Sequence, residues 1–265
     1  MSFQPVIPAS GYSGWIFLTK TLQSQQAVHA KSATLTRAED YFRANIAKAT
    51  TAEALVNDRR LLEVTLTAFG LEADIDAKAF IRKVLEEGTI NSKAFASRLS
   101  DKRYQQLAFT FGYGNLGARV NLTGFADEIL SKYKAKSFEA AVGTQDENLR
   151  LALNFEGGLA DIIKNGTTDR AQFFTLMGNT PLRKVVDTAL GLPTAFATLD
   201  IDKQLDQYKA RLSSTFGTAT FADLAKPENR EKMIRLFLIR AEAAAQGNGY
   251  SQAQTALTLL RGITG

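Results

Sequence analysis

Cysteine is absent from the 265-residue chain, and histidine and tryptophan occur once each. Without cysteine the chain can form neither disulfides nor thiolate metal sites, and it has no thiol nucleophile. The single imidazole, that of His29, cannot supply a multi-histidine ligand set and leaves little scope for histidine catalysis. We therefore expect no metal site, no cofactor and no catalytic residues.

Long apolar runs are missing as well. The longest uncharged apolar stretches, such as residues 13–19 and 253–260, are far shorter than the roughly 20 residues that span a bilayer. The opening MSFQPVIPASGYSGWIFLTK has no basic residue before its short apolar part and contains two prolines, which is unlike a secretory signal peptide. We expect a soluble protein without a transmembrane segment, and any export would use another route.

Neither sign of charge dominates. The chain has 32 basic and 27 acidic residues, and the two signs are interspersed, which leaves a net charge of +5. Mild basicity of this kind is weak evidence for a nucleic-acid or membrane-surface partner. Hydrophobic residues make up 45% of the chain, which is enough for a sizeable core without disulfides.

Start and stop signals for helices recur along the whole chain. Thr36 and Glu39 form a capping box, and Gly70 is well placed for the left-handed turn that ends a helix. Thr180 followed by Pro181 is a strong start signal, because proline at the first helical position lacks only an amide that would be unpaired anyway. These signals favour helices from end to end.

The predicted helices cover most of the chain. Residues 58–69 also fit a strand because of their β-branched content, and Gly157 with Gly158 predicts a bend in a long helix that Ser137 opens. A series of alternating strands separated by turns is missing, so we predict an all-α fold, a multi-helix array or bundle. The predicted ranges are 36–49, 58–69, 76–87, 92–99, 101–111, 125–134, 137–155, 180–191, 202–215, 227–246 and 251–261.

Two blocks of the sequence resemble each other. Residues 54–71, ALVNDRRLLEVTLTAFGL, align with residues 175–192, TLMGNTPLRKVVDTALGL, at a separation of about 121 residues. The identities are apolar positions, small residues and a helix-ending glycine, which is what two copies of one packing solution share. They pair Leu55, Leu61, Val64, Thr67, Ala68, Gly70 and Leu71 with Leu176, Leu182, Val185, Thr188, Ala189, Gly191 and Leu192.

The repeat predicts two diverged copies of one helical module. We assign residues 1–35 to an N-terminal segment, 36–120 to the first module, and 121–265 to connecting helices and the second module, in one continuous body. Agreement continues downstream, where Phe95, Ala96, Arg103 and Phe111 correspond to Phe221, Ala222, Arg230 and Leu238. The alternative is that any two amphipathic helices that end in glycine look alike.

Gly112, Gly114 and Gly117 spell G-x-G-x-x-G, the form of a dinucleotide-binding turn. That turn follows a strand and opens a helix inside a βαβ unit, whereas the preceding KRYQQLAFTF is more typical of a helix. We interpret the glycines as a helix stop and an irregular surface connection.

The sequence KYKAK places Lys132, Lys134 and Lys136 around Tyr133. A nucleic-acid site would use such lysines on phosphates and could stack a base on the aromatic ring. Helix exteriors normally carry both signs of charge, so solvated helix surface is the favoured interpretation and nucleic acid an unfavoured partner.

An apolar cluster follows the two N-terminal prolines. Trp15, Phe17 and Leu18, with Ile16 between them, are candidate partner-contact residues, and packing onto the protein's own body is the alternative. The C-terminal TALTLLRGI poses the same question through Leu257, Leu259, Leu260 and Ile263.

Four segments together resemble an uncharacterised alphaproteobacterial protein family. They are SFQPVIPASGYSGWIFLTKTLQSQQ, YFRANIAKATTAEALVNDRRLLEVTLTAFGL, FASRLSDKRYQQLAFTFGYG and GLPTAFATLDIDKQLDQYKARL, and the likeness spans nearly the whole chain. Members of that family are typically encoded among flagellar genes and have no established activity or catalytic residues. The resemblance implies an accessory or structural role in flagellar assembly.

The leading hypothesis is a non-enzymatic helical protein of the flagellar system that binds other proteins, flagellar components among them. It would reside in the cytoplasm or on the flagellum. A second hypothesis is a cytoplasmic helical adaptor or chaperone-like regulator whose basic face meets acidic partners or nucleic acid. An enzyme is a distant third option that would require a deep pocket with convergent polar groups.

Overall fold

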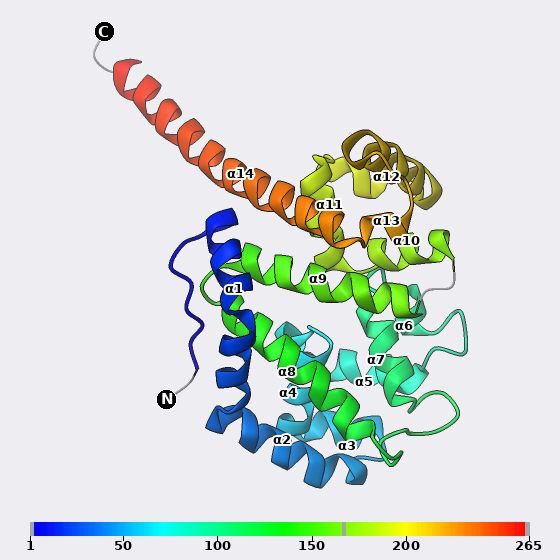
Figure 1. Ribbon diagram of the computed structural model, residues 1–265. Helices are drawn as coiled ribbons and strands as arrows, with labels where there is room; N and C mark the ends of the chain where they lie inside the picture. The colour runs from blue at the N-terminus through cyan, green and yellow to red at the C-terminus, as the bar shows by residue number, and fades with distance from the viewer. Residues whose placement is uncertain (1–2, 166–167, 263–265) are drawn as a thin grey trace. The chain divides into compact units, whose positions relative to one another are not determined.

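The computed structural model describes residues 3–165 and 168–262, and the regular structure within those ranges is entirely helical (Figure 1). The described residues form 14 α-helices and three short 3₁₀ helices and contain no strand. The predicted all-α class is therefore confirmed, and the strand alternative for residues 58–69 is wrong. No helix in the described ranges is both long enough and apolar enough to cross a membrane.

The contacts divide the chain into two compact units. Unit 1 consists of Met1–Ile7, Phe17–Arg150 and Met177–Thr180, and unit 2 consists of Pro8–Ile16, Leu151–Leu176 and Pro181–Gly265. The sequence-based division at residue 120 does not coincide with this one, because the helix of residues 125–143 packs on unit 1.

Helices α2 to α8 lie in unit 1. Their bounds are α2 Ala33–Asn45, α3 Ala52–Asn57, α4 Arg59–Ala68, α5 Lys78–Glu87, α6 Phe95–Arg98, α7 Arg103–Phe111 and α8 Phe125–Gly143, with 3₁₀ helices η1 Ile46–Lys48 and η2 Glu72–Asp74. Helices α10 to α14 lie essentially in unit 2, while α1 and α9 have residues in both. These bounds are α1 Gly11–Ala30, α9 Glu147–Asn165, α10 Asp169–Met177, α11 Thr180–Leu190, α12 Ile201–Phe216, α13 Phe221–Leu224 and α14 Pro227–Gly262, with η3 Thr194–Thr198.

Helix α4 is the centre of unit 1. Asp58 caps it, because its Oδ1 accepts the backbone amides of Arg60 and Leu61 at 3.0 and 3.1 Å. The helix then buries every residue from Leu61 to Ala68 except Glu63 and packs against α8 and α2. Burying a leucine or valine side chain stabilises a fold by about 1.5–3 kcal/mol, so this helix carries much of the core of unit 1.

Helix α11 contributes apolar side chains to the interior of unit 2. It begins at Thr180 and Pro181, as the sequence predicts, and buries Leu182, Val185 and Leu190 among its apolar residues. Aromatic side chains fill the rest of this core, including Phe173 and Phe221, whose rings meet edge to face with centroids 5.4 Å apart.

The last turns of α4 and α11 have the same hydrogen bonds. Gly70 and Gly191 take φ values of 68° and 66°, which only glycine adopts at little cost. The residue after each glycine donates its amide to the carbonyl five residues earlier: Leu71 to Leu66 and Leu192 to Asp187, both at 2.8 Å. The elements that follow also match in order: a 3₁₀ helix, a helix, a four-residue helix that starts with phenylalanine, and a further helix.

Several predicted helix boundaries need correction. Helix α2 starts after Ser32, so Thr36 lies inside its first turns and caps nothing. Helix α8 continues through Ser137 and ends at Gly143. Residues 144–146 separate it from α9, which Asp146 caps. Helix α9 continues uninterrupted through residues 157 and 158. Helix α14 joins two predicted helices into one, and α1, α3, α10 and α13 were not predicted.

Candidate functional site

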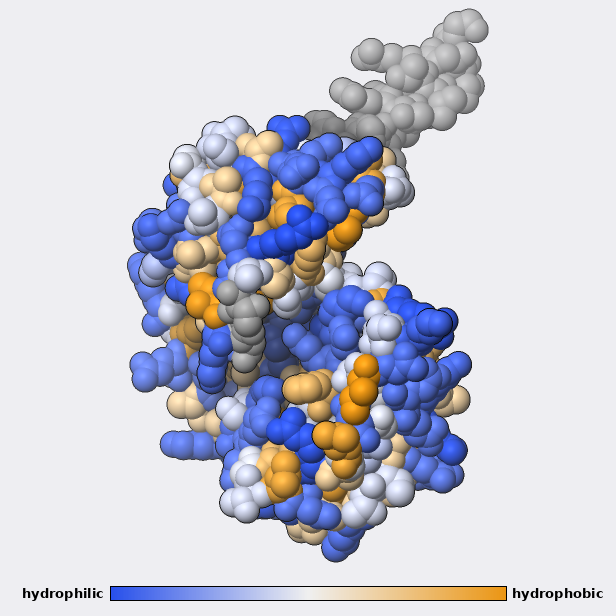
Figure 2. All heavy atoms as spheres, turned by 90° about the vertical axis from the view of Figure 1, so that its right-hand side faces the viewer, coloured by the Kyte–Doolittle hydropathy of each residue, from blue (hydrophilic) through white to orange (hydrophobic). Residues whose placement is uncertain are grey.

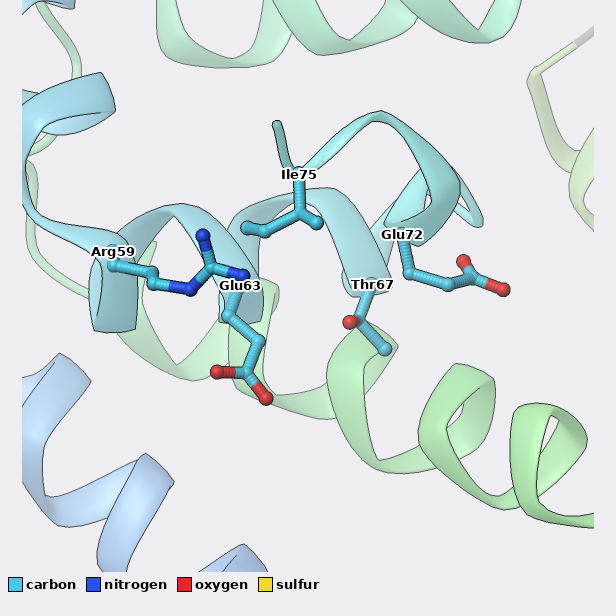
Figure 3. A pocket seen from close by; sticks show the side chains of 5 residues that line it. All are labelled: Arg59, Glu63, Thr67, Glu72 and Ile75. Atoms are coloured by element: carbon cyan, nitrogen blue, oxygen red, sulfur yellow. The ribbon is translucent and has the colours of Figure 1, made fainter. Parts of the chain in front are cut away.

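A pocket of about 280 Å³ opens on α4 and η2 in unit 1 (Figure 3). Two of its three charged side chains form ion pairs, Arg59 with Asp76 at 2.9 Å and Glu72 with Arg150. The described hydrogen bonds do not join the Thr67 hydroxyl to a carboxylate, so no nucleophile stands beside a base. In the close view the Arg59 guanidinium extends toward Glu63, whereas Glu72 points away. The lining residues are Arg59, Glu63, Thr67, Glu72 and Ile75.

The lysines of KYKAK are paired with carboxylates. Lys132 contacts Glu128 at 3.0 Å, Lys134 contacts Glu39 at 3.0 Å, and Lys136 contacts Glu139 at 2.9 Å. The ring between them, Tyr133, is buried, and burial raises its pKa to about 12. This stretch therefore offers neither unpaired cations nor a ring on which a base could stack.

The three glycines of G-x-G-x-x-G lie in an irregular connection between α7 and α8. Gly112 ends α7 in the left-handed conformation at φ 72°, and the next helix begins only at Phe125. A helix precedes the motif where a dinucleotide-binding turn requires a strand. The interpretation as a helix stop and surface connection is confirmed.

This connection is held firmly to the rest of unit 1. The Thr89 amide donates to Asn115 Oδ1 at 2.8 Å, and the Tyr113 hydroxyl donates to the Ala49 carbonyl at 2.5 Å. A Cβ at Gly114 would lie 2.2 Å from the Glu86 carbonyl oxygen, so only glycine permits this approach. A connection fixed in this way presents its side chains without a large ordering cost on binding.

Large apolar side chains stand exposed around the connection. Leu116 is 99% exposed and Phe109 is 61% exposed, and the Arg119 guanidinium lies 6.0 Å from the Phe109 ring centroid. Figure 2 views the side of the molecule where α6 and α7 lie and shows hydrophobic residues at its surface. We name this set the Leu116 surface: Ile90, Phe109, Leu116 and Leu122.

The sequence around the Leu116 surface has little charge. Across residues 104–126 the one charged side chain is Arg119, although 22% of all residues in the chain are charged. Large exposed apolar patches are typical of protein interaction sites. We did not predict this surface from the sequence. The feature that indicates it is the long stretch with one charge, which contains the glycines.

Two of the predicted partner-contact residues lie in the interior. Trp15 is 1% exposed, and its indole Nε1 donates to Glu231 Oε2 at 3.1 Å within unit 2. Leu18 is fully buried, three residues further on the same face of α1. Both side chains are packed in the interior, and a role of either in partner contact stays a prediction. Phe17 is half-buried, and partner contact there stays a prediction.

The side chains of the C-terminal candidates lie outside the described residues. This holds for Leu257, Leu259, Leu260 and Ile263, which the sequence proposes as a second apolar segment. No group of three or more metal-ligating side chains occurs in the part of the chain that the structure describes.

Fold and surface together define a class: an all-helical protein whose most distinctive exposed feature is an apolar surface beside a fixed connection. The chain belongs to the family described as "Protein of unknown function (DUF1217)", whose model matches residues 68–233. It is also similar to an X-ray crystal structure of a protein from Agrobacterium tumefaciens, with 28% identity and a TM-score of 0.68. That similarity covers 90% of this chain and 98% of the other. The comparison with curated proteins found no match.

Proposed function

We propose that this protein is a non-enzymatic accessory or structural component of the bacterial flagellar system that acts by binding other proteins. The Leu116 surface is the observation that carries the binding role. The flagellar assignment is supported by the resemblance of the sequence to an alphaproteobacterial family typically encoded among flagellar genes.

The energetics of the Leu116 surface favour a role in binding. Each leucine or phenylalanine that a partner buries fully contributes about 1.5–3 kcal/mol. Anchors of this kind dominate interface energies when a rigid scaffold presents them, as the contacts of Gly114 and Asn115 do for Leu116. The protein therefore gains affinity chiefly from apolar contacts, and Arg119 favours a partner that places a carboxylate nearby.

We also propose that the two units descend from one duplicated helical module. Support comes from the shared sequence block, the identical last turns of α4 and α11, and the common order of the elements after them. Leu116 and Leu122 of the Leu116 surface follow the last helix of the first series, α7, whereas the corresponding helix of the second series is the much longer α14. The two modules would then have diverged in how they meet partners.

The proposal is tested by replacing Leu116 in a flagellated bacterium that encodes this protein. A deletion strain receives the wild-type gene, Leu116→Asp, or the matched control Val28→Asp, which alters an exposed apolar residue elsewhere in unit 1. A buried aspartate opposes an apolar partner, so we expect L116D to lose most swimming and most recovery of flagellar proteins in pull-downs, while V28D resembles the wild type.

Three outcomes count against this proposal. Normal motility of the deletion strain together with pull-downs free of flagellar components would remove the flagellar role. Wild-type behaviour of L116D would show that the Leu116 surface does not bind the partner. Salt-sensitive binding to nucleic acid in a gel shift would favour the adaptor or regulator with a basic face instead.

A further inference from the structure

Residues 3–7 are held against unit 1 by side-chain amides. Gln25 on α1 binds Val6 at two points, because its Nε2 donates to the Val6 carbonyl at 3.1 Å and its Oε1 accepts the Val6 amide at 2.8 Å. Gln145, just after α8, donates to the Pro5 carbonyl at 2.7 Å. The backbone of this segment is therefore fixed by three hydrogen bonds that involve no regular secondary structure.

The one histidine of the chain lies beneath the same segment. The Phe3 ring centroid is 4.9 Å from that of His29, and the Phe138 ring centroid is 5.7 Å from it on another side. Phe3 and Phe138 also contact each other, with centroids 6.0 Å apart. His29 as a whole is 9% exposed, and segment 3–7 helps to close its surroundings.

The hydrogen bonds assign the proton on the imidazole. His29 Nε2 lies 2.9 Å from Ser137 Oγ, and the Ser137 hydroxyl donates to the Lys134 carbonyl at 3.1 Å. With the proton on Nε2, Ser137 accepts from the imidazole while its own hydroxyl donates to Lys134, whereas the other tautomer would leave a buried Nδ1–H without an acceptor, so the contacts favour the proton on Nε2. His29 Nδ1 is buried and has no hydrogen-bond partner among the residues that the structure describes. A second proton on Nδ1 would find no acceptor.

Among the described residues, no charged side chain compensates a positive imidazole. Residues 3–7 carry no titratable side chain, and Lys31, beyond α1, is exposed. On α8, Lys136 pairs with Glu139 and Lys134 pairs with Glu39 of α2, so these carboxylates are engaged. Burial lowers the pKa of His29 below its ordinary value of 6.5.

We propose that residues 3–7 form a pH-sensitive latch on unit 1, which protonation of His29 releases. In the docked state the imidazole is neutral, between Phe3 and Phe138, and with Phe3 removed water can solvate the imidazolium. Because the docked Phe3 ring adds to the burial that lowers the pKa of His29, the released state binds the proton more tightly. Docking is therefore strongest above about pH 6.5 and weakens as the pH falls toward the lowered pKa.

The test measures the Val6 amide in the full-length protein by NMR. Its protection against hydrogen exchange, relative to intrinsic exchange at each pH, is followed from about pH 7.5 to about pH 5, with the His29 ring signals as a record of protonation. We expect Val6 protection to fall as His29 takes up its proton, by up to about tenfold per pH unit. The Leu66 amide in α4 should keep its protection, which distinguishes release of the latch from unfolding.

His29→Gln is the matched variant, because glutamine cannot take up a proton in this range. Its Val6 protection should not change with pH, while Gln25→Ala should lose that protection at every pH. Protection that persists after His29 is protonated overturns the proposal. The proposal is also overturned if the Leu66 amide loses protection together with the Val6 amide, or if Val6 protection in H29Q changes with pH as in the wild type. If H29Q fails to fold, the wild-type titration alone decides.

Discussion

At the scale of residues, one contact occurs in both units with different burial. Arg103 donates to the Gly70 carbonyl at the end of α4, and Arg240 donates to the Ala189 carbonyl at the end of α11 at 2.7 Å. Arg103 also pairs with Asp101 at 2.7 Å, and both side chains are less than one-fifth exposed, whereas Arg240 is exposed. Cations at helix C-termini bind carbonyls that lack a partner within the helix, and they interact favourably with the negative end of the helix dipole.

Replacing each arginine by leucine shows how much each of the two contacts stabilises the protein. We expect Arg103→Leu to lower the free energy of unfolding by about 2–3 kcal/mol, because it leaves Asp101 partly buried without its cation. Arg240→Leu should cost less than about 1 kcal/mol, since solvent replaces much of its contact. Urea denaturation of both variants checks this, and equal losses would contradict the burial difference.

Sequence comparison found only part of this residue-level detail. Gly70 and Gly191 could be predicted as helix ends because few residues other than glycine adopt a left-handed conformation there. The alignment paired Arg103 with Arg230, yet Arg240 is the residue with the equivalent contact, and Arg230 Nε is buried without a partner. Which arginine reaches a carbonyl depends on how helices cross, and a one-dimensional pattern does not contain that information.

At the scale of elements, α9 carries two neighbouring glycines with different surroundings. A Cβ at Gly157 would meet open space, but one at Gly158 would lie 2.7 Å from Leu182 Cδ2 on α11. Leu182 is 1% exposed and cannot easily move aside. Gly158 therefore allows α9 and α11 to approach within unit 2, while Gly157 has no such role.

Alanine substitutions test this packing. Gly157→Ala should raise the free energy of unfolding by about 0.5–1 kcal/mol, because alanine is a better helix former. Gly158→Ala has the same helix preference but crowds Leu182, so we expect it to be less stable than G157A by about 1–3 kcal/mol. Thermal melts of the two variants give the difference, and two equally stabilised proteins would show that α9 and α11 are not so close.

Helix prediction from sequence succeeded where caps are local and failed where distant residues decide. Asp58 and Pro181 mark real helix starts through their own side chains. Helix α1 was missed because its buried residues, Trp15 and Leu18, find their partners far away in sequence, as the bond from Trp15 to Glu231 illustrates. Ser137 looked like a cap, but inside α8 it accepts a hydrogen bond from His29.

At the scale of the whole molecule, the composition of the chain limited the kinds of chemistry to expect but did not locate the Leu116 surface. The lack of cysteine and the single histidine made metal and thiol chemistry unattractive from the start. The Leu116 surface could not be found by hydropathy, because Leu116 and a core leucine such as Leu66 are the same residue type with opposite exposure. Only the tertiary structure tells them apart.

If the Leu116 surface binds a flagellar protein, crosslinking in living cells captures that contact. A photoreactive amino acid is placed at position 116 or, as a control, at position 28, and adducts are identified by mass spectrometry after illumination. We predict a discrete adduct between position 116 and a flagellar component. The same adduct should not form from position 28. No adduct at position 116, or the same adducts at both positions, would contradict it.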